Sequence, residues 1–392
     1  MGGKIKEVLN CDILICGAGL AGLSLAYRAL KSGLWQSEKI IIADPRENRL
    51  NDKTWSFWKK TSGDFDDLIF KSWTHLLVFS NSGEAIPLKT GPYSYNSIRS
   101  LDFYEHVIRY LKNQSNVQFV YEHIVSLETD ISQCTAVTEQ YTIRSLYVFN
   151  SIYEKPSLAK TSQYFLQHFK GVVIESSEIS MNTDEAYLMD YRTGQQYGTT
   201  FFYTLPLSSS SLFIEYTLFS KSLLDQASYD EAIASYIKNV LKLKTYIIKH
   251  SEFGIIPMTD HHFARTNGNI MNIGTMGGDT RGATGYTFTN VQKTISRILN
   301  SWKVSKKPGP FKEVISAKHM VYDAILLNVL DEKKYEGHEL FCDLFRNAKA
   351  ENIFKFLDAE SSLSEDLQII LSLRPLPFVK ALGKVVYSNV IQ

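Results

Sequence analysis

A glycine-spaced turn near the N-terminus is the clearest sign of chemistry in the sequence. Residues 17–22 read Gly17-Ala18-Gly19-Leu20-Ala21-Gly22, directly after an apolar run at 11–16 that is typical of a buried parallel strand. In this GxGxxG spacing the first glycine permits a tight turn, and the second lets a pyrophosphate approach the backbone. The third glycine lets the following helix pack on the strand, and the free amides at the start of that helix attract phosphate.

An acidic residue follows the next apolar run and strengthens this interpretation. Residues 39–43 read as a second strand, and Asp44 stands at its end, where a carboxylate accepts hydrogen bonds from the ribose of an adenosine. A GxGxxG turn alone is weak evidence. Strand, turn, helix, strand and acid in this order predict a bound dinucleotide; the alternative is a glycine turn with a structural aspartate.

A second glycine-rich segment lies far along the chain, at residues 274–285, after another apolar run. A flavin dinucleotide commonly needs such a distant segment, whereas a nicotinamide domain would normally be complete by then. Gly278 and Asp279 are expected beside the ribityl chain, with Asp279 bonding its hydroxyls. A helix beginning near Thr284 and Gly285 would direct its positive end at the flavin ring. The alternative is a glycine-rich loop with an exposed aspartate.

Two further segments hold candidate contacts. Arg99 opens a helix expected over 98–111 and could meet a cofactor phosphate, although an arginine on a solvated face is the commoner case. Trp55 and Phe57 follow the polar loop at 45–52 and indicate either a pocket wall or ordinary core packing.

Composition limits the classes of function. The 392 residues allow two or three domains, and 42 Lys+Arg against 41 Asp+Glu give no broad charge that would attract nucleic acid. The four cysteines, at positions 11, 16, 134 and 342, fit neither a metal site nor a disulfide framework, so a reduced cytoplasmic chain is expected. No apolar stretch approaches the ~20 residues of a transmembrane helix.

The periodicity of the remaining chain predicts the elements that position these residues. Strands are expected at 73–79, 84–88, 117–120, 141–143, 146–150, 171–175 and 186–192, a hairpin at 201–219, and a helix over 229–247. Residues 311–392 read as helices. The predicted fold is α/β: a Rossmann-type FAD-binding domain of the glutathione-reductase or hydroxylase kind, an antiparallel-sheet substrate domain and a helical C-terminal region. The expected ranges are 1–50, 98–172 and 266–300 for the first, 51–97 and 173–265 for the second, and 301–392 for the third.

The sequence resembles the flavin-dependent lycopene cyclases of the bacterial type, which are related to the plant β- and ε-cyclases, over most of its length. The pairing of Trp-Ser-Phe with Leu-Pro-Leu and Glu-x-Thr is specific, and the glycine motif is not. The matching segments are Gly17-Ala18-Gly19-Leu20-Ala21, Lys53-Thr54-Trp55-Ser56-Phe57, Met189-Asp190, Tyr203-Thr204-Leu205-Pro206-Leu207, Leu212-Phe213-Ile214-Glu215-Tyr216-Thr217, Thr284-Gly285-Tyr286 and Arg374-Pro375-Leu376-Pro377.

The chain departs from the family pattern at two places. Tyr216 stands where the family usually has a second acid, which puts a mechanism with paired carboxylates in doubt. The segment Gly277-Gly278-Asp279 has an aspartate that relatives often lack, which brings it closer to general flavoprotein usage.

The resemblance implies cyclisation of the ψ ends of lycopene, or of another linear carotenoid, to β-ionone rings without net redox change. Reduced FAD would be the cofactor and NAD(P)H its reductant, with no metal. Glu215 would be the catalytic acid and base, and Trp55, Phe57, Phe201 and Tyr203 would line the path of the cation. The C-terminal region would contact a membrane from the cytoplasmic side. The number of rings, β against ε ring, and the oligomeric state stay open.

The residues themselves give Glu215 a plausible environment. Strand alternation places it on one face with Phe213, Thr217 and Phe219, and such apolar neighbours would hold its proton to higher pH. The alternative is a strand glutamate paired with a lysine or arginine. Rival functions are an FAD-dependent monooxygenase, an isoprenoid reductase, and a non-catalytic carotenoid or flavin carrier.

Overall fold

The first layer of the fold is an eight-stranded sheet built around the N-terminal strand. The computed structural model describes residues 6–130, 132–159 and 162–391. The strands run in the order β17-β18-β11-β1-β2-β8, with β10 and β9 continuing from β11, and β1 is parallel to both of its neighbours. The strands are β1 (Glu7–Cys16), β2 (Ile40–Ala43), β8 (Val117–Val120), β9 (Ser126–Thr129), β10 (Cys134–Val137), β11 (Tyr141–Asn150), β17 (Thr266–Asn267) and β18 (Ile270–Asn272).

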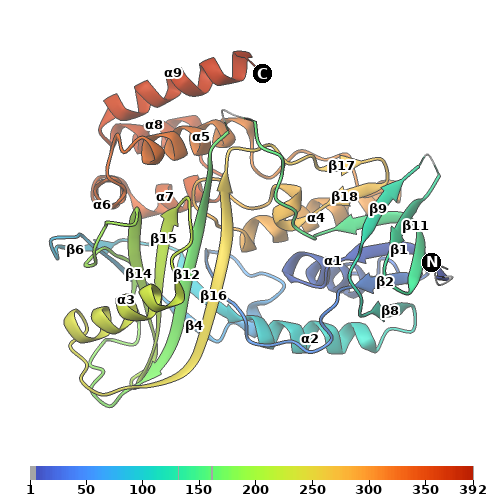
Figure 1. Cartoon of the computed structure of the whole chain (residues 1–392), viewed down its shortest axis with the longest axis horizontal. Coiled ribbons are helices and arrows are strands. Elements are labelled where there is room, and N and C mark those ends of the chain that lie inside the picture. The colour runs from blue at the N-terminus through green and yellow to red at the C-terminus, as the bar shows by residue number, and fades with distance from the viewer. Residues whose placement is uncertain (1–5, 131, 160–161, 392) are drawn as a thin grey trace.

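The glycine turn joins this sheet to its first helix. Helix α1 (Leu20–Lys31) begins directly after Gly19 and, with α2 (Ser100–Lys112) and α4 (Phe288–Ser305), covers one face of the sheet (Figure 1). Gly17 has a φ of +96°, which glycine adopts without strain. A Cβ at Gly22 would lie 2.1 Å from the Gly17 carbonyl oxygen, so glycine is required for this close packing. The predicted strand, turn, helix and strand are thus confirmed.

The second layer is a seven-stranded, mostly antiparallel sheet in the order β16-β12-β15-β14-β13-β5-β6. Helix α3 (Gln226–Asn239) packs on one face through aromatic side chains, among them Tyr236, which stacks on Phe202 of the sheet. The strands are β5 (His75–Phe79), β6 (Ala85–Leu88), β12 (Tyr164–Glu175), β13 (Glu185–Asp190), β14 (Thr199–Ser208), β15 (Ser211–Ser220) and β16 (Ile247–Thr259).

Several element boundaries differ from expectation. The helix expected over 229–247 ends at Asn239, because the chain turns there, with Lys242 at a φ of +60°, before β16 begins. Residues 141–150 form one strand rather than two. The boundary expected between residues 172 and 173 falls inside β12, which belongs wholly to the seven-stranded sheet. The division into domains otherwise stays a prediction.

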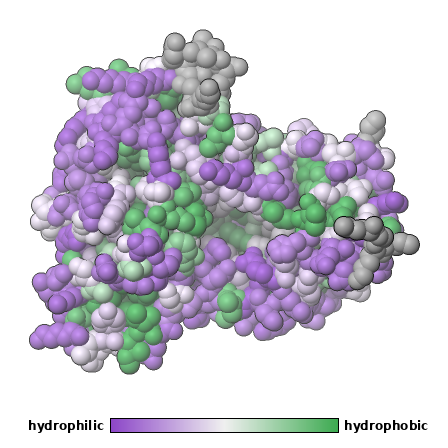
Figure 2. Space-filling view, in the orientation of Figure 1, coloured by the Kyte–Doolittle hydropathy of each residue, from purple (hydrophilic) through white to green (hydrophobic). Residues whose placement is uncertain are grey.

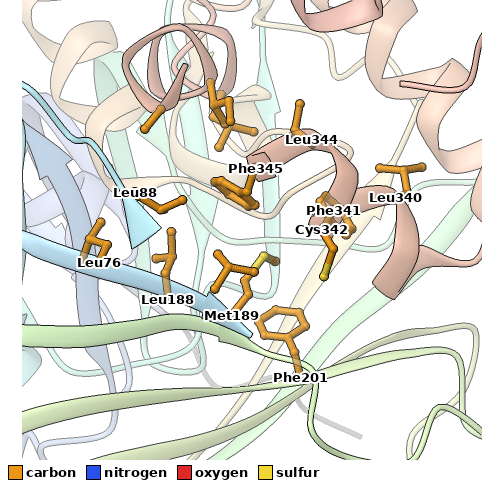
Figure 3. Packing of buried hydrophobic residues seen from close by; sticks show 14 of the residues in the cluster. Leu76, Leu88, Leu188, Met189, Phe201, Leu340, Phe341, Cys342, Leu344 and Phe345 are labelled. Atoms are coloured by element: carbon orange, nitrogen blue, oxygen red, sulfur yellow. The ribbon is translucent and has the colours of Figure 1, made fainter. Parts of the chain in front are cut away.

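A small sheet and a cluster of helices complete the fold. The small sheet contains β3 (Thr54–Lys59), β7 (Ser94–Arg99) and β4 (Lys71–Trp73), and the short helices are η1 (Asp66–Leu68) and η2 (Gly274–Gly277). The C-terminal helices are α5 (Ala317–Asp331), α6 (Gly337–Asn347), α7 (Ala350–Leu357), α8 (Leu363–Leu371) and α9 (Pro375–Ile391). Figure 3 shows Phe341 and Phe345 of α6 on the side toward Leu188 and Phe201 of the seven-stranded sheet.

The architecture confirms the predicted fold class, a Rossmann-type α/β unit with an antiparallel sheet and a helical C-terminal region. None of the helices within the described ranges is both long and apolar enough to cross a membrane.

Candidate active site

One cavity of about 480 Å³ connects the glycine turn with the seven-stranded sheet. Gly19, Leu20 and Ala21 lie at one end, and Tyr203, Phe213 and Glu215 belong to the sheet that forms the opposite wall. Residues 254–257 of β16, the edge strand of that sheet, also line it. Figure 2 shows hydrophobic side chains around a hollow between β16 and the N-terminal unit. The candidate cofactor-binding turn and the candidate acid therefore line the same cavity.

The residues at the glycine turn fit a dinucleotide. A Cβ at Gly19 would meet no atom within 4 Å in the described part of the chain, so the backbone is open to a ligand there. The Ala18 amide instead donates to Asp44 Oδ2 at 2.9 Å, and Asp44 Oδ1 accepts from the Arg46 amide at 2.9 Å. Arg49 Nη2 lies 3.0 Å from the same Oδ1. Asp44 thus holds the turn and has cationic neighbours that were not predicted.

The second glycine-rich segment also reaches the cavity, but Asp279 does not. Gly274, Thr275, Thr284 and Gly285 line the cavity, whereas Gly278 lines a separate small pocket. Asp279 is buried behind the loop, where Oδ2 accepts from the Gly274 amide at 2.8 Å.

The other oxygen of Asp279 also has protein partners, which corrects the expected bond to ribityl hydroxyls. Its Oδ1 accepts from Thr294 Oγ1 at 2.6 Å and from Arg265 Nη2 at 2.9 Å. The carboxylate therefore shapes the loop from behind. The helix expected from 284–285 begins at Phe288 instead, because Gly285 has a φ of +71° that helices do not adopt.

Arg99 does not reach the cavity. Its side chain is half exposed at the start of α2, and Nε donates to Asp102 Oδ2 at 2.7 Å. The basic side chains that line the cavity are Arg46 and Lys53, from the polar loop after β2. They were missed because two cations in a polar loop carry no pattern that distinguishes them from solvated residues.

Glu215 is buried and faces the cavity. Register places Tyr203, Glu215, Gly171 and Glu252 opposite one another on four neighbouring strands. Thr217 Oγ1 donates to Glu215 Oε1 at 2.9 Å. Burial, and to a smaller extent the nearby charge of Glu252, raise the pKa of Glu215 to about 8 against the opposing effect of the Thr217 hydrogen bond. The carboxyl therefore holds a proton at neutral pH.

Glu252, which the sequence analysis missed, lies beside the cavity on the same face of the sheet as Glu215 and does not line the cavity itself. Its Oε1 accepts from the Thr54 amide at 3.1 Å and its Oε2 from Thr54 Oγ1 at 2.7 Å. Burial raises the pKa of Glu252 to about 7 against the opposing effect of the two Thr54 hydrogen bonds. One signal was available in the sequence: an apolar run, Phe253-Gly254-Ile255-Ile256-Pro257, begins immediately after Glu252.

Two of the four predicted aromatic contacts lie at the cavity. Trp55 and Tyr203 line it. Phe57 stacks behind the lining residue Phe288, with ring centroids 4.3 Å apart. Phe201 is fully buried in the core beneath α6 (Figure 3) and does not line the cavity, which corrects its assignment. The unpredicted aromatic lining residues are Tyr95, Tyr104, Tyr153, Phe169, Phe213, Tyr286 and Phe288.

Comparison with known proteins gives a family match and a shared fold. The family model described as "Lycopene cyclase protein" matches residues 12–382. No protein in the search of curated proteins matches the chain significantly.

Solved structures with the same fold have low sequence identity. A geranylgeranyl bacteriochlorophyll reductase-like protein from Thermoplasma acidophilum has a TM-score of 0.62 at 13% identity, with 96% of this chain and 100% of that chain covered. A flavoprotein/dehydrogenase from Cytophaga hutchinsonii has a TM-score of 0.61 at 11% identity, covering 97% and 99%. The flavin-dependent monooxygenase PieE, in complex with FAD and substrate, has a TM-score of 0.56 at 12% identity, covering 96% and 72%.

Proposed function

Because the chain belongs to the lycopene cyclase family, we propose that it converts the ψ ends of lycopene, or of a related linear carotenoid, into β-ionone rings. One observation carries this proposal beyond the family: Glu215 is a buried carboxyl that holds its proton at neutral pH and faces a cavity extending to the glycine turn.

Glu215 supplies the proton that starts the reaction. The carboxyl transfers it to a terminal double bond of the substrate, and the resulting carbocation closes the ring by forming a carbon–carbon bond. Loss of a ring proton to the Glu215 carboxylate restores the acid, so the reaction is an isomerisation without net redox change. Trp55 and Tyr203 place aromatic rings at the cavity, where a cation gains roughly 0.5 to 2 kcal/mol per favourable contact.

FAD, in its reduced form and with NAD(P)H as reductant, is the cofactor that we assign to this cavity. Gly19, Leu20 and Ala21 would meet its pyrophosphate, and Thr284 and Gly285 its flavin end. Gly17, Ala18 and Gly22 support the turn from behind, and Asp44, at the end of the next strand, would accept hydrogen bonds from the ribose as well as from the Ala18 amide. When bound, the reduced flavin supplies a negative charge that stabilises the nearby cation.

The test is anaerobic incubation of the flavin-loaded protein with lycopene and chemically reduced FAD. Cyclic product should form without consumption of reducing equivalents, and chromatography of the product shows its ring type. Unchanged lycopene would contradict the proposal. Consumption of NADPH in proportion to an oxygenated or saturated product would instead support a monooxygenase or an isoprenoid reductase.

Helices α8 and α9 carry an exposed apolar surface that we propose contacts a membrane peripherally, on the cytoplasmic side. The side chains recur at helical spacing, so each helix presents one apolar stripe. They are Leu363, Leu367, Ile370 and Leu371 of α8 and Leu376, Val379, Leu382 and Val386 of α9.

The double variant Leu371→Ser/Leu376→Ser should bind phospholipid vesicles at least about tenfold more weakly than the wild type in a sedimentation assay. Both side chains are more than 70% exposed, and burying one leucine contributes about 1.5 to 3 kcal/mol. Val304→Ser, at a still more exposed position on α4, is the control and should bind as the wild type does. Equal binding by all three proteins would exclude these helices as the docking surface.

A further inference from the structure

The seven-stranded sheet brings a second carboxyl close to Glu215 from a different strand. Gly171 of β12 pairs with Glu215 of β15 on one side and with Glu252 of β16 on the other. Directly paired residues point to the same face of a sheet, so both carboxyl groups project toward the same side. Their Cα atoms are two strand spacings apart, about 10 Å.

The gap between the two acids is hydrocarbon. A Cβ added at Gly171 would lie 2.8 Å from the Phe213 ring and 3.1 Å from Glu252 Cγ, so these groups fill the space that a side chain would occupy. Both carboxyl groups are buried, Glu215 at 8% and Glu252 at 4% exposure. Charges separated by apolar groups are screened far less than charges in water.

The hydrogen bonds of the two acids are unequal. Both oxygens of Glu252 accept, from the Thr54 amide and hydroxyl, whereas Glu215 accepts one hydrogen bond, from Thr217, among the described residues. More donors favour the ionised form. Glu252 is therefore the member that loses its proton first.

The other titratable groups do not offset this interaction at Glu215. Glu215 faces the phenols of Tyr95, Tyr203 and Tyr286, which are neutral at physiological pH. Lys53, Asp52 and His250 lie around Glu252, and His250 Nε2 is 3.9 Å from Glu252 Oε2. Lys53 also lines the cavity, but its ammonium pairs with Asp52 at 3.0 Å. No cation in the described ranges is ion-paired with Glu215.

We propose that Glu252 is a positioning residue for Glu215: its carboxylate, acting across Gly171, keeps the proton on Glu215, while its bonds to Thr54 fix the strand that carries Trp55. The two acids then share one proton through the neutral range and titrate as a pair. The role in catalysis rests on the proposed cyclisation, but the sharing of the proton does not. Tyr216, which occupies the family's usual place for a second acid, packs on the opposite face of the sheet with α3.

The test compares Glu252→Gln with Glu175→Gln, a control on the same sheet with an exposed side chain that pairs with Lys249. Infrared spectroscopy of the flavin-free protein follows the C=O stretch of the protonated carboxyl that disappears in Glu215→Gln. Removing the charge at position 252 should move the midpoint of this band about one pH unit lower. Glu252→Asp, which retains the charge, should keep the midpoint close to its wild-type value, and Glu175→Gln should leave the midpoint unchanged.

The pH dependence of cyclisation gives the second measurement. Activity needs protonated Glu215 and falls as pH rises through its pKa, so the basic limb should move to lower pH in Glu252→Gln. An unchanged infrared midpoint in a folded Glu252→Gln protein would overturn the proposal, even if lycopene is cyclised. A shifted midpoint in a protein that cyclises nothing would support the shared proton and count against the proposed function instead.

Discussion

Glu215→Gln is expected to lower the rate of lycopene cyclisation by at least about 100-fold, because positioned general acids contribute about 10²- to 10⁴-fold. Glutamine keeps the shape of the side chain and can still accept the hydrogen bond from Thr217, but it cannot deliver a proton. Since Glu215 is uncharged at neutral pH, the substitution introduces no unpaired charge and the fold should be retained. Single-turnover formation of product with reduced FAD measures the effect.

Tyr216→Phe is the matched control for this prediction. Tyr216 is adjacent in sequence but lies on the other face of β15, stacked on Phe202 beneath α3. The cyclisation rate of the Tyr216→Phe variant should stay within a few-fold of the wild-type rate. If Tyr216→Phe were as inactive as Glu215→Gln, the acid would have to act through the opposite face of the sheet, and the assignment of the cavity would be wrong.

Gly19→Val should weaken FAD binding at least about tenfold, equivalent to about 1.4 kcal/mol, without destabilising the flavin-free protein. The backbone at Gly19 is extended and a Cβ there meets open space, so valine fits the fold. Its side chain would however project into the part of the cavity where the pyrophosphate is expected. Titration of the flavin-free protein with FAD, followed by fluorescence, measures the affinity.

Two other glycines sharpen this test. Gly22→Val should lower the melting temperature instead, since its Cβ would lie 2.1 Å from Gly17 O and 2.9 Å from Ile15 Cγ2, and overpacking costs about 1 to 3 kcal/mol. Gly383→Val is the control: it also faces open space, but in α9, and should bind FAD normally. Normal FAD binding by Gly19→Val would place the pyrophosphate elsewhere.

The parts of the fold that the sequence predicted well are those specified by neighbouring residues. The strand, glycine turn and helix at residues 13–31 depend on apolar runs and glycine spacing within one short segment. The hairpin that carries Glu215 was likewise readable, because alternation along β15 decides which residues share its face.

The parts that the sequence did not predict depend on contacts between distant segments. Phe201 and Tyr203 share one face of β14, but α6 covers the first and leaves the second at the cavity. Asp279 faces away from the cavity because Arg265 and Thr294 bind it from behind. Glu252 joins the site through the register of three strands, which no local pattern specifies.

The position of Gly171 between Glu215 and Glu252 also limits how the seven-stranded sheet can be redesigned. Lys170, its neighbour on β12, points to the other face, where Nζ pairs with Asp230 of α3 at 2.6 Å. Because side chains alternate along a strand, sliding β12 by one position in one direction would bring the Lys170 ammonium between the two acids, whereas the opposite slip would bring Val172 there. An ammonium there would turn a proton-retaining pair into an ion-paired triad, so a one-residue shift toward Lys170 should silence the acid even where every cavity residue is preserved.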